Sequence, residues 1–131
     1  MTAYARVTLS DNQIMTTLRE VVAERPYFIY SPPEHHDDDT ARCYYVHVDE
    51  NGDNETPGCL VGAVLNRLGV PLDVLAKYEG SGAGSVSRAV ANVSDTAALA
   101  LAVAQDAQDN GAAWSRALEA AEQYAPVAAF I

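Results

Sequence analysis

Basic residues are scarce in this sequence. Lysine and arginine together number 8, against 18 aspartates and glutamates, which gives a net charge of -10 over 131 residues. A surface of that sign repels the phosphate backbone of nucleic acids, so direct nucleic-acid binding is disfavoured. It would instead attract a cation or the basic surface of a partner protein.

Long apolar runs are also missing. No stretch approaches the ~20 apolar residues that a membrane helix needs, and the residues after Met1 do not resemble the apolar part of a signal peptide. We therefore expect no membrane partner and a cytoplasmic location, in the host cytoplasm if a bacteriophage encodes the chain.

Cysteine is rare too. Cys43 and Cys59 are the only two, and in a reducing cytosol they are expected to be thiols.

What the sequence does contain is typical of a folded protein. With 49% hydrophobic residues, a chain of this length can bury a core, and we expect one domain over residues 1–131. It divides into an acidic loop or hairpin at 31–58 and a helical core at 59–125. The predicted fold class is mainly α, a bundle of about four to five helices with a short β-hairpin or two-stranded element.

Helical signals appear at both ends of the chain. Ser10 is placed as an N-cap, Ile14, Leu18, Val21 and Val22 share one helical face, and Pro26 ends that helix. In the second half, "CLVGAVLNRLG" predicts a helix that stops at Gly69, with a shorter helix from Pro71. "GSGAG" at 80–84 is expected to be a flexible connection. Two long helices follow, the first opened by Ser94 and ended by Gly111, and the second carrying Trp114.

Residues 31–58 hold most of the charge. Eight acids and one arginine, Arg42, give this segment a net charge of -7. The acids are Glu34, Asp37, Asp38, Asp39, Asp49, Glu50, Asp53 and Glu55. Within it, "ARCYYVHV" is the best strand in the chain, and "ENGD" supplies an Asn-Gly turn, a strong hairpin signal. We expect a short hairpin here, with "YFIY" at 27–30 as a further pairing partner.

Calcium binding is one alternative for the same turn. Asp49, Asn51 and Asp53 have the one, three, five spacing of a calcium loop. That loop also requires glycine at its sixth position and a bidentate glutamate at its twelfth, where this chain has Asn54 and Leu60. The hairpin interpretation is therefore favoured.

Metal or thiol chemistry is another alternative. Cys43, His47 and Cys59 could supply three zinc ligands and His36 a fourth, but the sequence lacks the closely spaced ligand pairs of structural zinc sites. Cys59 begins a helix, where the dipole favours a thiolate, yet "CLVG" also predicts a buried first turn. We assign no catalytic residue, no metal and no cofactor from these patterns.

Two segments carry a resemblance to other proteins. "PGCLVGAVLNRLGVPLDVL" and "AQDAQDNGAAWSRALEAA" are similar to segments of small uncharacterised helical proteins of actinobacteria and their bacteriophages, over about residues 43–123. The shared motifs are Cys-Leu-Val-Gly and Gln-Asp-x-Gly-x-x-Trp. Both indicate packing, with a close backbone approach at Gly62 and a tryptophan lying back across a helix pair.

The leading functional hypothesis is a non-enzymatic protein that binds a partner with a basic surface through its acidic segment. One alternative is a small metal-dependent or cysteine hydrolase centred on Cys43, His47 and Cys59. Another is an acidic mimic of nucleic acid, in which carboxylates stand in for phosphates. The alanine-rich helix and the apolar end "PVAAFI" further favour a homodimer.

Overall fold

The computed structural model describes residues 4–31, 44–49, 51–53, 55–79 and 81–124, and its first helix lies where the sequence predicts one. This helix, α1, spans Asp11–Glu24. The Ser10 hydroxyl accepts a hydrogen bond from the Gln13 N–H, and the Gln13 side chain accepts one from the Ser10 N–H. This capping box satisfies two backbone donors at the start of α1, and the helix ends directly before Arg25 and Pro26.

The second half of the chain is helical, as predicted. Its elements are α2 (Leu60–Arg67), α3 (Leu72–Leu75) with the 3-10 turn η1 (Ala76–Tyr78), α4 (Ala83–Val90), α5 (Asp95–Asp109) and α6 (Trp114–Glu122). Gly69 and Gly111, which follow α2 and α5, have positive φ angles of 109° and 92°, so both predicted helix ends are confirmed.

The connection expected at 80–84 is shorter than predicted. Ala83 and Gly84 already belong to α4. The reason is burial: Ala83, Val86, Ser87 and Val90 form the buried side of this helix, and their spacing places them along one face.

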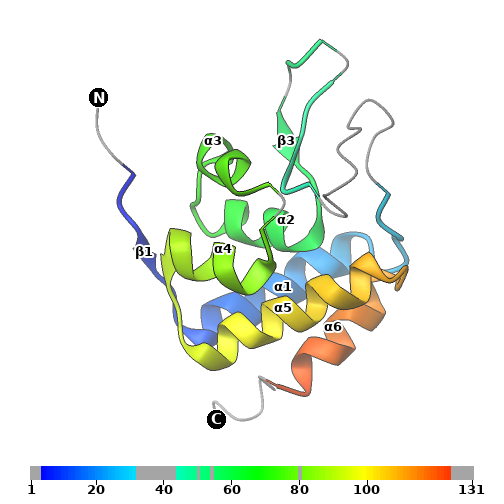
Figure 1. Ribbon diagram of the computed structural model, residues 1–131. Coiled ribbons are helices and arrows are strands. Elements are labelled where there is room, and N and C mark those ends of the chain that lie inside the picture. Colours follow the sequence, from blue (N-terminus) through cyan, green and yellow to red (C-terminus); the bar gives the residue numbers. More distant parts are fainter. Residues whose placement is uncertain (1–3, 32–43, 50, 54, 80, 125–131) are drawn as a thin grey trace.

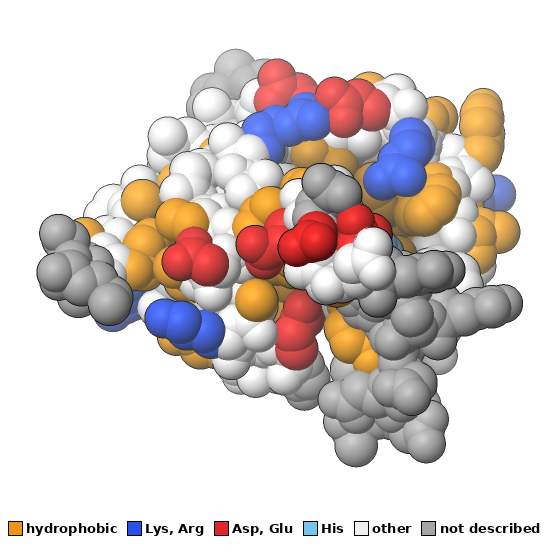
Figure 2. Space-filling model, turned by 90° about the horizontal axis from the view of Figure 1, so that it is seen from above, with side chains coloured by type: hydrophobic (Ala, Val, Ile, Leu, Met, Phe, Trp, Pro, Cys, Tyr) orange, Lys and Arg blue, Asp and Glu red, His pale blue; other side chains and the backbone are white. Residues whose placement is uncertain are grey.

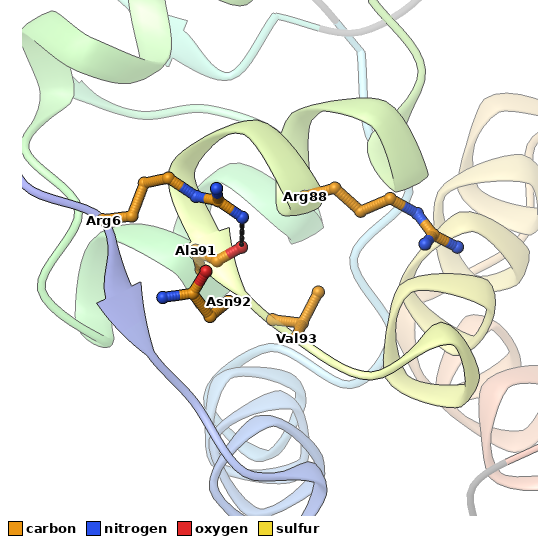
Figure 3. Close-up of a pocket in the computed structure, with 5 residues that line it drawn as sticks. All are labelled: Arg6, Arg88, Ala91, Asn92 and Val93. Carbon is orange, nitrogen blue, oxygen red and sulfur yellow. Dashed lines mark hydrogen bonds between the residues drawn. The ribbon is translucent and has the colours of Figure 1, made fainter.

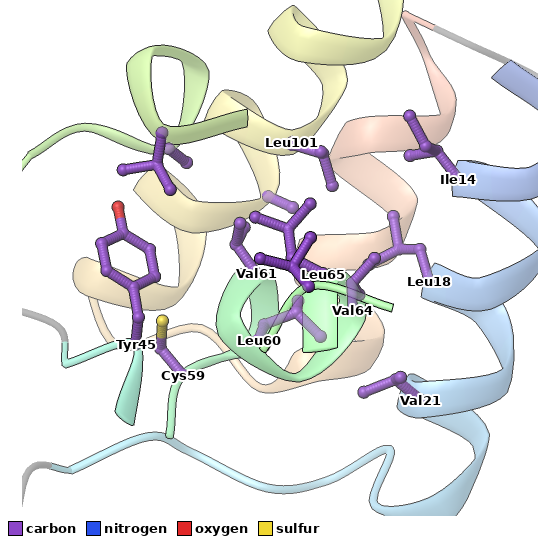
Figure 4. Packing of buried hydrophobic residues seen from close by; sticks show 14 of the residues in the cluster. Ile14, Leu18, Val21, Tyr45, Cys59, Leu60, Val61, Val64, Leu65 and Leu101 are labelled. Carbon is purple, nitrogen blue, oxygen red and sulfur yellow. The ribbon is translucent and has the colours of Figure 1, made fainter. Parts of the chain in front are cut away.

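The helices form two layers around one apolar core. α1, α5 and α6 run side by side in one layer, and α2, α3 and α4 lie over them (Figure 1). Figure 4 shows Leu18 of α1, Leu101 of α5 and Val61, Val64 and Leu65 of α2 converging in this core. The mainly helical fold with a short hairpin is confirmed.

Trp114 fixes the corner between α5 and α6. It is 1% exposed, and its indole N–H donates to the Gln108 Oε1 atom at 3.2 Å. The same oxygen accepts the Leu60 backbone N–H at 2.8 Å. The buried side chain of Gln108 in α5 is therefore hydrogen-bonded to the first residue of α2 and to the first residue of α6. The predicted packing of the tryptophan across the helix pair is confirmed.

Two small β-pairs complete the fold. β1 (Val7–Thr8) pairs in parallel with β4 (Ala91–Asn92), a contact that the sequence did not indicate. β2 (Val46–His47) pairs antiparallel with β3 (Thr56–Pro57) and forms the predicted hairpin.

Among the described residues, 27–30 forms no strand pairing with the hairpin. Ile29 instead forms an isolated bridge with Ala113. The carbonyls of Pro26 and Phe28 accept the backbone N–H groups of Ser115 and Trp114 at 2.8 and 2.9 Å. This segment is therefore used to satisfy the free donors at the start of α6.

Candidate functional site

The hairpin rises from the helical layers and carries the described part of the acidic segment (Figure 1). We use the name acidic hairpin for residues 44–49, 51–53 and 55–58. Asp53 and Glu55 are exposed on it and Asp49 is half-buried. Figure 2, which looks down on this side of the molecule, shows acidic side chains close together near the middle of the face. Glu34, Asp37, Asp38, Asp39 and Glu50 lie outside the described residues.

The turn of the acidic hairpin is built around the Asp49 carboxylate. Its Oδ1 atom accepts the backbone N–H groups of Asn51 and Asp53, each at 2.9 Å. The Asp49 carbonyl accepts the Gly52 N–H at 2.9 Å, and Gly52 has a φ of 82°, which suits glycine in a tight turn. The hairpin prediction is confirmed, and the carboxylate oxygen that would begin a calcium loop is used by the turn itself.

Glu79 anchors the other end of the hairpin. Its Oε1 accepts the Tyr45 N–H at 2.7 Å and its Oε2 accepts the Val46 N–H at 3.2 Å. Burial raises the pKa of this carboxyl above its ordinary value, and the two backbone hydrogen bonds partly offset that shift. Sequence reasoning missed this residue, because nothing around Tyr78 and Glu79 indicates a contact with a strand that lies 34 positions away.

Close backbone contact holds the hairpin against α2. A Cβ atom at Gly62 would lie 2.4 Å from the Tyr45 carbonyl oxygen, and one at Gly58 would lie 2.1 Å from that of Tyr44. Only glycine fits at these distances, so the approach predicted at Gly62 is confirmed. Tyr45 is buried beside it and donates its hydroxyl to the Ser81 carbonyl. Burial raises the pKa of the Tyr45 phenol.

Tyr30 and His47 form a polar contact at the base of the hairpin. The Tyr30 hydroxyl lies 2.7 Å from His47 Nε2 and accepts the Tyr44 N–H at 3.0 Å. Burial raises the pKa of Tyr30 to about 12. The hydroxyl accepts from Tyr44 and donates its own hydrogen to His47 in the tautomer whose Nε2 carries no hydrogen. His47, a candidate metal ligand from the sequence, is therefore engaged in holding the hairpin.

The expectation of free thiols is wrong for Cys59. This residue is fully buried and disulfide-bonded. Its sulfur is not a thiolate in this state, so it is available neither as a zinc ligand nor as a nucleophile. Cys43 and His36, the other ligands considered, lie outside the described residues. Among the residues that the structure describes, no three histidine, cysteine or acidic side chains are grouped to hold a metal.

A broad pocket lies on the opposite edge of the helical layers, beside β1 and β4. Its volume is about 480 Å³, and it is lined by Arg6, Arg88, Ala91, Asn92 and Val93. Figure 3 shows the Arg6 guanidinium at the Ala91 carbonyl and the Arg88 side chain extending away from Arg6. Arg6 donates to the Ala91 carbonyl at 3.2 Å, and Arg88 pairs with Asp95 at 2.5 Å. The two positive charges are thus not directed at a common point.

Comparison with known proteins adds no family to this description. No protein-family model, curated protein or solved structure matches the chain significantly. Within the described residues, no helix has both the length and the apolar character to cross a membrane.

Proposed function

We propose that the protein binds a basic surface of a partner protein through the acidic hairpin and that this role does not involve catalysis. The observation that supports it is the combination of exposed Asp53 and Glu55 with a backbone that is held at several points. The turn is closed on Asp49, and the base is tied to Glu79 and Tyr30.

A fixed backbone matters for binding because ordering a loop opposes association. Immobilising a side chain or loop at an interface costs about 0.5–1.5 kcal/mol for each rotamer-rich group. In the acidic hairpin the backbone hydrogen bonds are already formed. Charges presented in this way steer a basic partner during encounter, which mainly raises the association rate and makes it sensitive to salt.

The test uses a variant that neutralises the two exposed carboxylates, Asp53→Asn with Glu55→Gln. Wild-type protein is used to capture partners from a lysate of the native cell, and the main partner is purified for titration. We expect the double variant to bind this partner about 3- to 30-fold more weakly, because each exposed contact contributes roughly 0.3–1 kcal/mol. The loss should shrink at high salt.

The matched control is Glu20→Gln with Glu119→Gln, which removes the same net charge from exposed positions on α1 and α6. It is expected to bind like wild type. Equal weakening by both variants would show that net charge alone acts, and unchanged binding by the hairpin variant would refute the proposal.

Source and location belong to the same proposal. We propose a small protein of an actinobacterium or its phage that acts in the cytoplasm, and the disulfide at Cys59 makes the location testable. Disulfides persist mainly in oxidising compartments. Thiol labelling of protein quenched in acid directly from native cells should find Cys59 reduced if the location is cytoplasmic. A homodimer through residues 126–131 is a further proposal, but that segment lies outside the described residues.

A further inference from the structure

A second, smaller pocket is lined by residues from α1, α2, α6 and the end of the hairpin. In Figure 1 the end of α1 and the start of α6 lie on the same side of the molecule. The volume of the pocket is about 270 Å³, and its lining includes Val21, Arg25, Pro57, Ala63, Arg67 and Trp114. Glu24 and Asn66 complete the lining, so half of its residues are apolar or aromatic, and two arginines against one glutamate leave it with a net positive charge.

Arg25 is held in this pocket by aromatic rings. Its guanidinium carbon lies 4.2 Å from the ring centroid of Phe28 and 4.7 Å from that of Trp114. The two rings are themselves perpendicular, with centroids 4.9 Å apart. Contact with the two rings holds the cation in position, and its N–H groups can still donate to a ligand.

The charge of Arg25 is not matched by a carboxylate. Within the described part of the chain, four other arginines form ion pairs, Arg19, Arg67, Arg88 and Arg116. Arg25 forms none there. In a chain with more than twice as many acidic as basic residues, this arrangement leaves an oriented positive group beside an apolar wall.

The rim of the pocket does not cancel that charge. Arg67 pairs with Glu24 at 2.7 Å, and the Asn66 amide donates to the Val70 carbonyl at 3.0 Å. The turn that carries Arg25 is also fixed, since the Phe28 carbonyl accepts the Trp114 backbone N–H at 2.9 Å.

We propose that this pocket binds a small organic carboxylate. Its two oxygens would accept the paired N–H groups of Arg25, the geometry in which a guanidinium binds a carboxylate most strongly. Its apolar part would lie against Pro57 and Ala63, the partly exposed apolar residues of the lining. At roughly 30 Å³ for each water-sized group, the volume admits a ligand of about nine non-hydrogen atoms.

Benzoate, which has that size, is the probe, and benzamide is its uncharged counterpart. The full chain, labelled with nitrogen-15, is titrated with each and with inorganic phosphate while the indole N–H signal is followed by NMR. Trp114 is the only tryptophan, so this signal needs no further assignment. We expect a saturable shift with benzoate and at least tenfold weaker binding of benzamide and phosphate.

Substitutions then test the role of Arg25. Arg25→Gln should weaken benzoate binding at least tenfold, and Arg25→Lys, which keeps the charge without the paired donors, should lie between it and wild type. Arg116→Gln, an exposed arginine on α6, is the control and should bind like wild type. Well-dispersed spectra for each variant establish that it is folded.

Three results would overturn the proposal: a missing benzoate shift, equal binding of benzamide or phosphate, or unchanged benzoate binding by Arg25→Gln. Partner capture through the acidic hairpin is expected to be unaffected by Arg25→Gln, so the two proposals fail independently.

Discussion

The helical body and the acidic hairpin are held by different kinds of interaction. Leu18, Leu65 and Leu101 come from three helices of the body, and each is fully buried among apolar neighbours. The hairpin buries Tyr45 and Val46 in the same core but adds polar anchors, the Glu79 carboxylate and the contact between Tyr30 and His47. The disulfide-bonded Cys59 follows it directly in the chain.

The difference determines what each region responds to. Apolar packing depends on volume and is insensitive to pH or redox state. Carboxylates, phenols and disulfides change with proton and electron availability. We therefore expect conditions to exist in which the hairpin opens while the body stays folded, as in other proteins whose segments differ in local stability.

Removing volume from the body should have the largest effect. Leu65→Ala deletes a fully buried side chain of α2, and such truncations cost about 2–5 kcal/mol. Urea denaturation followed by far-UV circular dichroism measures the change. Leu99→Ala on α5 is the control because this side chain is 48% exposed, and its effect should stay within about 0.5 kcal/mol. Similar losses for both variants would contradict the assignment of Leu65 to the core.

Reduction of the disulfide should come next and should act mainly on the hairpin. Loss of a disulfide typically costs about 2–4 kcal/mol. With reductant, the amides of Tyr45 and Val46 should exchange with deuterium faster, and those in the middle of α1 should change less. A variant with both cysteines changed to serine should no longer respond to reductant. Equal acceleration throughout the chain would mean that the two regions unfold together.

Most of the body could be predicted because its signals are local. The capping residues Ser10 and Ser94 lie within three positions of the N–H groups that they accept from. Glycine after α2 and α5, and apolar spacing within each helix, act over similarly short distances. α4 was harder to predict, because its small residues do not distinguish a helix from a linker until their burial is known.

The anchoring of the hairpin could not be predicted in the same way. Tyr30 and His47 are 17 positions apart, and Glu79 reaches Tyr45 across 34. No local pattern marks such pairs, since the fold alone brings them together. The state of Cys59 was missed for another reason: it was inferred from an expected compartment, whereas the residue is disulfide-bonded.

Removing the Tyr30 hydroxyl tests the polar base of the hairpin. Tyr30→Phe removes the hydroxyl that accepts the buried Tyr44 N–H and that contacts His47, a change that costs about 1–3 kcal/mol. Thermal unfolding measures this loss of stability, and Tyr27→Phe, at an 85% exposed position, should have no measurable effect.

The pH dependence of wild type gives a second test. Burial raises the pKa of Tyr30 to about 12, so its neutral form stabilises the fold below pH 10, and this contribution is lost as the pH rises through 12. Absorbance at alkaline pH should therefore show Tyr30 ionising after exposed tyrosines.

Glu79 should give the smallest effect and the sharpest pH signature. Glu79→Gln keeps an acceptor for Tyr45 and removes the one for Val46, at a cost of about 0.5–1.5 kcal/mol. Because burial raises the pKa of Glu79 above 4.5, its protonation stabilises the folded state. That contribution is complete below pH 4.5 and is lost as the pH rises through the raised pKa. The stability advantage of wild type over Glu79→Gln should consequently be larger in acid than at neutral pH. The midpoints of urea unfolding of the two proteins, compared at each pH, measure this difference. All other carboxyls are present in both proteins, so their titration cancels in the comparison. A difference that grows toward neutral pH would show that the ionised carboxylate, rather than the acid, is the form that the hairpin prefers.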